Sequence, residues 1–566
     1  MSIKKFRQIL FNSFLIIIFF YLENAFSQNK ISNVNIASSN LPLVFINTDG
    51  QTIKDQERIT AQMGIIDNGN GVRNNISDEF NNYNGLIAIE LRGSSSSAYP
   101  KPQYRIETQD SLGDNLNVSL CDLPTENDWI LYGPYNDKSL LRNVLSYKLS
   151  NQLGRYASRT VYCELFVNYE YLGIYVLMEK IKRDNDRVDI SKLTELDNSG
   201  DELTGGYLVK IDRIEWNSVG YWYSNFGTPY QHEYPKDDEI TPQQKEYIIN
   251  YFNDFEQLMN SDNYNDPETG YRNVIDIDSF VDHFLLNEFC KNVDAYRLSA
   301  YMYKDKDSVN NKLIAGPIWD FNLTFGDAWI TGEIGFSDGW QIDYSVLHPD
   351  DPFKVPFWWK KLLKDNEFSS KVKTRWNELR NNILDHNTLF KVIDSTASYI
   401  QEARLRNFQR WPEILSSTYE DEILQLKGWI LKRLMWMDTN IDLLTQIDQT
   451  ENNNIPNNFI VYQNYPNPFN PVTTIKYRIP SSTVLLNSFQ HQSNSEIPEK
   501  DLAYNVNVQI KIYDMLGREI KTLLNEQQRP GIYEIEWDAT NYPSGIYFYK
   551  ITAGNIFDIK KMMLLK

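Results

Sequence analysis

Strand-like segments are the commonest pattern between residues 28 and 211 of this chain, and helix-like segments dominate between residues 278 and 436. The early segments are short, rich in β-branched and aromatic residues and bounded by turn residues, as in Leu41–Asn47 and Leu86–Leu91. The later segments repeat apolar residues every three or four positions. Strands followed by helices are typical of an α+β fold, so we expect a β-rich lobe and then a helical lobe.

Two helices of this pattern are specific enough to place. Residues 139–153 carry leucines at four-residue spacing, which predicts a helix. Asp278 is the expected N-cap of a second helix, which carries Val281 and Phe289 on one face and ends near Asn292.

The last hundred residues return to strand-like alternation. A polar stretch at residues 448–458 predicts a linker, and residues 459–566 predict a β-sandwich domain. Within that domain, Ser481–Ala503 interrupts the alternation and is expected to be a loop. We therefore assign residues 28–447 to a preceding domain, with its core at about 40–440.

The first residues predict an export signal. Lys4, Lys5 and Arg7 make the start basic, residues 9–22 are mostly apolar, and small residues precede a cleavage site after Ser27. The alternative is a membrane anchor. The apolar run is shorter than the roughly 20 residues that a spanning helix needs, which favours a cleaved signal at residues 1–27.

Composition excludes several classes of protein. The chain has 566 residues, of which 42% are hydrophobic and 14% aromatic, so it is globular and builds a substantial core. A net charge of −19 without a basic stripe excludes nucleic-acid binding. Such an acidic protein would need a metal cation to bind a nucleotide. The three cysteines form no disulfide framework, and the cysteines and histidines lack zinc-ligand spacing.

Asp294 and Asp320 flank a predicted β-hairpin, whose strands are Tyr301–Tyr303 and residues 312–319. Phosphoryl transfer requires that phosphates are held, their charge neutralised and the acceptor hydroxyl aligned. Two carboxylates meet these needs. The one before the hairpin faces the acceptor hydroxyl, and the one after the hairpin holds the metal. The alternative is a pair of ordinary loop aspartates.

Two further segments are candidates for nucleotide binding. Arg92, Ser95 and Lys101 belong to a loop of small residues after a strand, where backbone amides can approach a phosphate. Glu179 ends an apolar strand at a possible hinge between lobes, where backbone groups would meet an adenine. The alternatives are an ordinary serine-rich loop and a strand that ends at the protein surface.

Taken together and in this order, these segments resemble the CotH kinase family, the spore-coat protein H-like secretory kinases, over about residues 40–440. The matching stretches are Arg92-Gly93-x-Ser95-Ser96 with Pro100-Lys101, Asp137-Lys-Ser-x-x-Arg142-Asn143, Gly173-x-Tyr175-x-x-x-Glu179-Lys180-Ile181, Asn292-x-Asp294, and Pro317-Ile-Trp319-Asp320-Phe321-x-x-x-Phe325-Gly326. The resemblance implies an atypical two-lobed protein-kinase-like fold, ATP with Mg²⁺ or Mn²⁺, and phosphorylation of Ser or Thr on secreted or surface proteins.

The resemblance also implies roles for single residues. Asp294 matches the catalytic aspartate, Asp320 the metal-binding aspartate, and Lys101 the nucleotide-binding lysine. Ser299 stands where a kinase has its second metal ligand, an asparagine, and Asn322 is the residue that would compensate. This departure keeps a kinase-like protein without activity as an alternative.

The tail resembles the type IX secretion C-terminal sorting domain over about residues 459–566. The matching stretches are Tyr465-Pro-Asn-Pro-Phe-Asn-Pro471, Ile512-Tyr-Asp-Met-Leu-Gly-Arg518, Tyr542-Pro-Ser-Gly-Ile-Tyr547 and the basic end Lys560–Lys566. The resemblance implies contact with the type IX export machinery and a final place outside the cell or on its outer surface.

Three functions therefore compete. The first is an exported kinase that transfers the γ-phosphate of ATP to Ser or Thr of a protein substrate. The second is a catalytically inactive surface protein, structural or adhesive, that uses the same fold. The third is a nucleotide-binding enzyme that transfers another group.

Overall fold

The chain divides into two compact units, residues 1–444 and residues 445–566, each with its own hydrophobic core. The computed structural model describes residues 36–93, 96, 99–214, 218–327, 335–414, 418–442, 444, 459–479, 506–515, 518–529, 531–554 and 556–566. The predicted export signal, the predicted linker and the predicted loop Ser481–Ala503 lie outside these residues.

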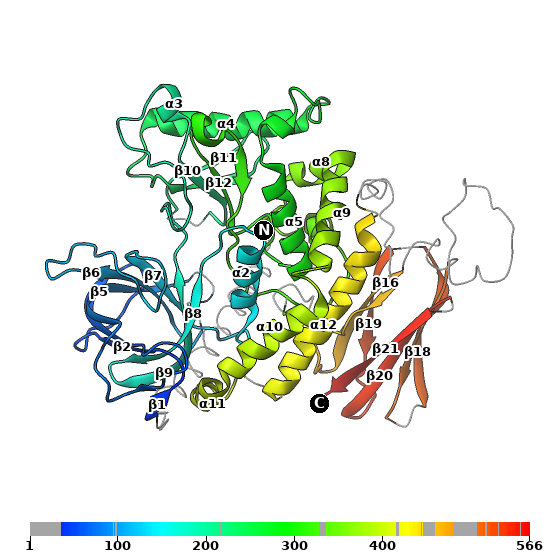
Figure 1. Cartoon of the computed structure of the whole chain (residues 1–566). Coiled ribbons are helices and arrows are strands. Elements are labelled where there is room, and N and C mark those ends of the chain that lie inside the picture. The colour runs from blue at the N-terminus through cyan, green and yellow to red at the C-terminus, as the bar shows by residue number, and fades with distance from the viewer. Residues whose placement is uncertain are drawn as a thin grey trace, which may run out of the picture. The chain divides into compact units, whose positions relative to one another are not determined.

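The first unit begins with a closed β-barrel (Figure 1). Around the barrel the strands follow the order β2 (Leu43–Asn47), β3 (Ile59–Ile66), β5 (Tyr83–Arg92), β6 (Gln103–Gln109), β7 (Asp128–Tyr132), β9 (Glu170–Glu179) and β8 (Thr160–Val167). β8 closes the barrel by pairing in parallel with β2, and every other neighbouring pair is antiparallel. Apolar side chains such as Ile89 and the fully buried Trp129 fill its interior, so this barrel is a packed core and not a channel.

A second sheet follows the barrel. Its order is β11 (Tyr221–Tyr223), β12 (Pro229–Tyr234), β10 (Tyr207–Ile211), β13 (Ala300–Lys304) and β14 (Leu313–Ala315). β13 and β14 pair antiparallel, with Met302 opposite Ala315, which confirms the predicted hairpin. A two-residue pair, β1 (Ser38–Ser39) with β4 (Asn74–Asn75), completes the strands of this unit that the structure describes.

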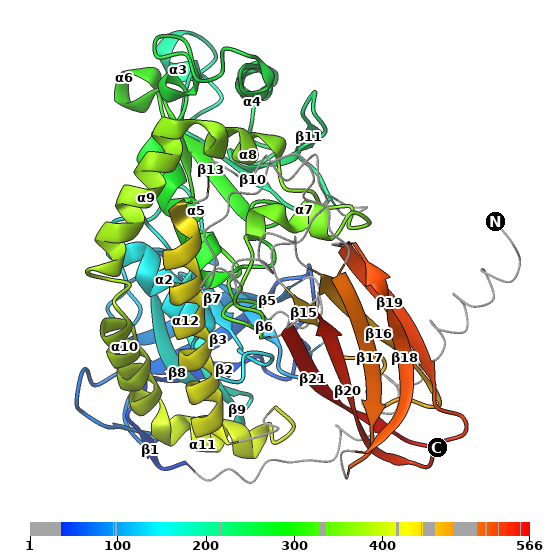
Figure 2. The same ribbon diagram turned by 90° about the vertical axis from the view of Figure 1, so that its right-hand side faces the viewer.

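Helices make up most of the rest of the first unit. They are α2 (Arg142–Gln152), α3 (Gly200–Leu203), α4 (Pro242–Asn260), α5 (Ile277–Cys290), α6 (Asp307–Asn310), α7 (Tyr344–Leu347), α8 (Phe357–Lys364), α9 (Asn366–Arg380), α10 (His386–Tyr399), α11 (Gln401–Arg410) and α12 (Tyr419–Asn440), with 3₁₀ turns at Tyr271–Asn273 and Gln341–Asp343. Figure 2 shows α5, α9 and α12 packed side by side. Within the described part of the chain, no helix is both long and apolar enough to cross a membrane.

The predicted N-cap of α5 is wrong by two residues. The side chain of Asp276 accepts a hydrogen bond from the backbone N–H of Ser279, and Asp278 lies in the first turn of the helix. Asp276 caps the helix because its own backbone is extended, as an N-cap requires. At the other end Lys291 adopts a left-handed conformation and stops the helix just before Asn292, where the sequence predicted it.

A buried ion pair joins α5 to α12. The carboxylate of Glu288 and the guanidinium of Arg433 lie 3.3 Å apart, and both side chains are fully buried. Glu288 also accepts hydrogen bonds from the backbone amides of Gln341 and Ile342. Because its lone pairs are satisfied, this charge is tolerated in the core, where it joins α5, which precedes the hairpin, to α12, which follows it.

The second unit is a β-sandwich. One sheet has the order β15 (Ile460–Val461), β16 (Val472–Ile479) and β19 (Gly531–Asp538); the other has the order β18 (Glu519–Gln528), β17 (Val506–Tyr513), β20 (Gly545–Ala553) and β21 (Ile556–Leu564). Alternate side chains from both sheets, such as Trp537 and Ile551, form one shared core. The observed elements thus confirm an α+β chain with a strand-rich start, a helical middle and a β domain at its end.

Candidate functional site

A cavity of about 710 Å³ opens in the first unit where the barrel, the second sheet and the flanks of the hairpin meet. Its walls come from the ends of β5, β9 and β10, from β12, and from the segments before β13 and after β14. The charged side chains that these elements contribute include Arg92, Lys180, Lys210, Asp212, Glu233, Asp294 and Asp320.

Asp294 and Asp320 both line this cavity, so the hairpin brings its two flanking carboxylates to one space. The backbone N–H of Asp320 donates to the hydroxyl of Tyr147 at 3.2 Å. Asp320 and Ser299 both have positive φ angles, 61° and 50°. Non-glycine residues adopt this conformation at a cost, which marks both positions as functional candidates.

Both carboxylates have raised pKa values. Burial raises the pKa of Asp294 to about 6, and the negative charges of Asp320 and Asp212 add to the rise, while Arg297 opposes it. The carboxylate of Asp320 is open to the cavity, yet the enclosing walls raise its pKa as well, with Arg92 opposing and Asp212 adding. The negative charges of Asp212, Asp294 and Asp320 therefore act within one cavity.

Among the predicted nucleotide-binding residues, Arg92 shares the cavity with Asp294 and Asp320. It lines the cavity, its charge acts on Asp320, and its guanidinium lies 5.5 Å from the ring centre of Trp319. Ser95 lies outside the described residues.

The structure places Lys101, the predicted phosphate-binding lysine, outside the cavity. Its side chain is buried, and its Nζ donates to the carbonyl of Ile174 at 2.6 Å and to Oδ1 of Asn407 at 2.8 Å. Burial also lowers the pKa of Lys101 well below its ordinary value. The amine holds β9 against α11 and does not line the cavity.

The side chain of Glu179 also lies outside the cavity. Its fully buried carboxylate accepts hydrogen bonds from the guanidinium and the backbone N–H of Arg159. The next residue, Lys180, lines the cavity. Successive side chains point in different directions at this strand end, so Lys180 and not Glu179 faces the cavity.

Lys210, Asp212 and Glu233 are wall residues that the sequence reasoning missed. The Nζ of Lys210 lies 3.6 Å from a carboxylate oxygen of Asp212 and 3.6 Å from one of Glu233. These carboxylates and Tyr301 raise the pKa of Lys210, although burial opposes them. The sequence contains one indication of this cluster, because Lys210 lies inside the apolar run Tyr207–Ile211. A charged residue in a buried strand needs partners of opposite charge.

Arg142, which belongs to one of the family-like stretches of the sequence, has a structural role. Its guanidinium pairs with Asp137 at 2.6 Å and donates from Nε to the carbonyl of Thr324 at 3.0 Å. These contacts join the start of α2 to the segment that follows Asp320. Arg142 does not line the cavity.

The donors present fit a magnesium or manganese ion that is shared with phosphates. Asp320, Ser299 and Asn322 all line the cavity and offer oxygen ligands. No group of three His, Cys, Asp or Glu side chains that could hold a metal exists among the described residues. Magnesium typically takes one or two carboxylates and completes its shell with water and substrate phosphates, so a site with few protein ligands suits it.

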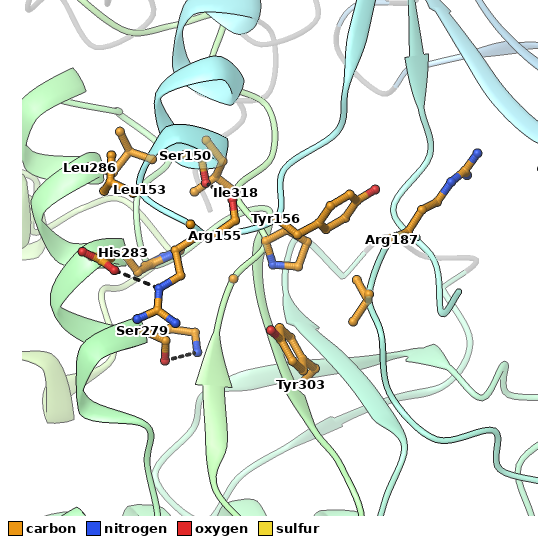
Figure 3. Close-up of a pocket in the computed structure, with 16 residues that line it drawn as sticks. Ser150, Leu153, Arg155, Tyr156, Arg187, Ser279, His283, Leu286, Tyr303 and Ile318 are labelled. Atoms are coloured by element: carbon orange, nitrogen blue, oxygen red, sulfur yellow. Dashed lines mark hydrogen bonds and ion pairs between the residues drawn. The ribbon is translucent and has the colours of Figure 1, made fainter. Parts of the chain in front are cut away.

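A second, smaller cavity of about 70 Å³ lies behind the segment that leads to Asp320 (Figure 3). Gly316, Pro317 and Ile318 form part of its wall. On the α5 side, Nε of Arg155 donates to Asp282 at 2.8 Å (Figure 3). This space has room for a few water molecules and none for a nucleotide.

Comparison with known proteins adds two matches. The family model described as CotH kinase protein matches residues 89–437, and the one described as Secretion system C-terminal sorting domain matches residues 463–565. Both agree with the resemblances seen in the sequence. No curated protein matches the chain.

Proposed function

This chain belongs to the CotH kinase family, and on that premise we propose that it is an exported protein kinase that transfers the γ-phosphate of ATP to Ser or Thr of secreted or surface proteins. The sorting domain supports export to the cell surface or secretion and contact with the secretion machinery. The observation that carries the proposal is the meeting of Asp294, Asp320 and Arg92 in one cavity.

In the proposed reaction, Asp294 orients the acceptor hydroxyl and takes its proton. The hydroxyl oxygen forms a bond to the γ-phosphorus, the bond from that phosphorus to the bridging oxygen breaks, and ADP leaves. A raised pKa suits Asp294 to this role, because the carboxylate then holds a proton more readily.

Asp320, with Ser299 and Asn322, would hold the divalent metal, which neutralises charge on the phosphates when it is bound. Arg92 and the lysines at positions 180 and 210 line the same cavity and offer further positive charge to the phosphates. A kinase-like division into a barrel-containing lobe and a helical lobe is part of the proposal, with the cavity between them as the nucleotide site.

Transfer of labelled phosphate from ATP to protein, with Mg²⁺ or Mn²⁺, tests the proposal. We expect Asp320→Ala and Asp294→Asn each to lower the rate by at least about a hundredfold. Asp278→Asn, which changes an exposed aspartate of α5 outside the cavity, serves as the matched control and should leave the rate unchanged. Absence of transfer by the wild-type protein with both metals would refute the kinase proposal.

Ser299 favours the second candidate, an inactive kinase-like surface protein, because a hydroxyl is a weaker metal ligand than an amide oxygen. Ser299→Asn separates the two. Its φ of 50° is a conformation that asparagine tolerates well, so the substitution fits the backbone. If the protein is an active kinase, Ser299→Asn should lower the metal concentration that gives half-maximal phosphate transfer, and the rate of transfer should not fall. An inactive wild type that gains transfer through Ser299→Asn would support the second candidate.

A further inference from the structure

Six cationic side chains line the large cavity, and four of them form ion pairs with carboxylates. The paired ones are Arg105, Lys180, Lys210 and Arg297. The other two are Arg92 and Arg213, for which the described part of the chain supplies no ion pair. Arg92 lies beside Asp320, where nucleotide phosphates would take up its charge.

Arg213 lines the same cavity as Asp294. Its positive charge opposes the rise in the pKa of Asp294. The guanidinium lies 5.3 Å from the ring centre of Phe353, another wall residue. An aromatic ring under a guanidinium holds its plane and leaves its donors directed outward.

The backbone of Arg213 is held on both sides. Its N–H donates to Oδ1 of Asp212 at 2.8 Å, and its carbonyl accepts from Nε2 of Gln231 at 2.9 Å. The end of β10 is therefore anchored to β12, and the side chain starts from a defined position.

The nearby carboxylates already have other partners. Asp212 lies 3.6 Å from Nζ of Lys210, and Asp351 accepts from the hydroxyl of Tyr344 at 2.7 Å and lies 3.4 Å from Arg297. Asp294 itself lies 3.3 Å from Arg297. Among the described residues, the positive charge of Arg213 therefore has no carboxylate partner, although it lines the same cavity as Asp294.

We propose that Arg213 binds an acidic group of the acceptor polypeptide, next to the hydroxyl that faces Asp294, and so determines which Ser or Thr is modified. This inference rests on the proposed kinase function. The group is a carboxylate of Asp or Glu or a phosphate already attached to the substrate, because a guanidinium makes paired, charge-assisted hydrogen bonds to both.

Synthetic peptides with one serine test the inference on the full chain. The serine is flanked by alanine, aspartate, phosphoserine or lysine, and both the dissociation constant and kcat/KM are measured. We expect the wild-type protein to favour a flanking acidic residue at least tenfold over alanine. Arg213→Ala should abolish this preference, with the loss carried by KM, and Arg213→Glu should shift it toward lysine.

Lys476→Ala is the matched control, because Lys476 is also an exposed cation over an aromatic ring but belongs to the second unit. It should keep the wild-type preference. A stronger response to phosphoserine than to aspartate identifies phosphate as the group, and the reverse identifies carboxylate; both support the inference.

Peptide binding separates the two proposals. Arg213-dependent binding of acidic peptides without phosphate transfer would refute the kinase function and leave the acidic-group site standing. Equal affinity of the wild-type protein for acidic and neutral peptides would overturn the inference, and so would a preference that survives in Arg213→Ala, even in an active kinase.

Discussion

Asp294 is held where its negative charge costs free energy. Burial and the charges of Asp320 and Asp212 raise its pKa to about 6, against roughly 3.9 in an unfolded chain. Between these values the folded state binds a proton that the unfolded state does not. The carboxylate therefore destabilises the folded protein above pH 6, and the penalty fades as the pH falls toward 4.

Replacing Asp294 by asparagine should remove this penalty. In metal-free protein at pH 8 we expect Asp294→Asn to raise the free energy of unfolding by about 1–3 kcal/mol, and the gain should vanish near pH 4. Thermal unfolding at the two pH values, in the presence of a chelator, measures it.

Asp351→Asn is the control of opposite sign. The pKa of Asp351 is lowered, because hydrogen bonds from Tyr344 and the backbone of Phe353 outweigh the effect of burial. A lowered pKa stabilises the folded state above the unfolded value, so this variant should lose stability at pH 8 and much less at pH 3. A less stable Asp294→Asn at pH 8 would contradict the account of Asp294.

Substitutions of Lys101 and Arg92 should affect different properties, the first mainly the free energy of unfolding and the second mainly the affinity for ATP. Lys101→Met removes the donor to the Ile174 carbonyl and should cost about 1–3 kcal/mol, while the affinity of the folded protein for ATP stays within twofold. Arg92→Ala should weaken ATP binding at least tenfold with a smaller loss of stability. Denaturant unfolding and nucleotide titration measure both. A tenfold loss of ATP affinity in folded Lys101→Met would restore the role that the sequence suggested for it.

Among the elements, α5 ends shortly before Asp294, so the position of its C-terminal end fixes where the chain reaches the site. The helix begins at the Asp276 cap and stops at Lys291, three residues before Asp294. On the other side of the site, α11 packs against β9, where Gly173 has a φ of 94° and a Cβ there would lie 2.5 Å from Oδ1 of Asn407. Only glycine allows this approach, which brings Asn407 to Lys101.

At this scale the cap of α5 can be tested. Asp276→Ala should lower the free energy of unfolding by about 1 kcal/mol, because the N–H of Ser279 loses its acceptor. Asp278→Ala, two residues later on an exposed position of the same helix, should change it by less than about 0.5 kcal/mol. Equal losses in the two variants would contradict the assignment of the cap.

At the scale of the whole molecule, two separate cores predict two separate unfolding transitions. Trp537 is 2% exposed in the core of the sandwich. Trp537→Ala should cost the second unit about 3–5 kcal/mol and lower only one transition in calorimetry. Residues 1–444 should keep their transition and any phosphate transfer. A shift of both transitions would show that the two units unfold together.

Much of this architecture is readable from the sequence because its causes are local. Alternation and turn residues place β13 and β14, and hence put Asp294 and Asp320 at the two ends of one hairpin. The four-residue leucine spacing predicts α2, although the helix starts three residues later than the pattern suggests. Hydrophobic periodicity does not fix the start of a helix to within two residues, and either aspartate suits an N-cap. The pattern therefore does not distinguish Asp276 from Asp278 as the cap of α5.

The order of the elements, the two family resemblances and the pair of aspartates can be read from residues that lie near one another in the chain. Which of two neighbouring charges faces the cavity depends on contacts with distant residues. Glu179, the last residue of β9, is buried and pairs with Arg159, whereas the next residue, Lys180, lines the cavity. Lys101 is buried because Asn407, 306 residues away in the chain, accepts a hydrogen bond from its Nζ. Because side chains alternate along a strand, a shift of one residue decides whether a charged side chain faces the cavity or the interior. The residue that binds the inward-facing side chain comes from a distant part of the chain.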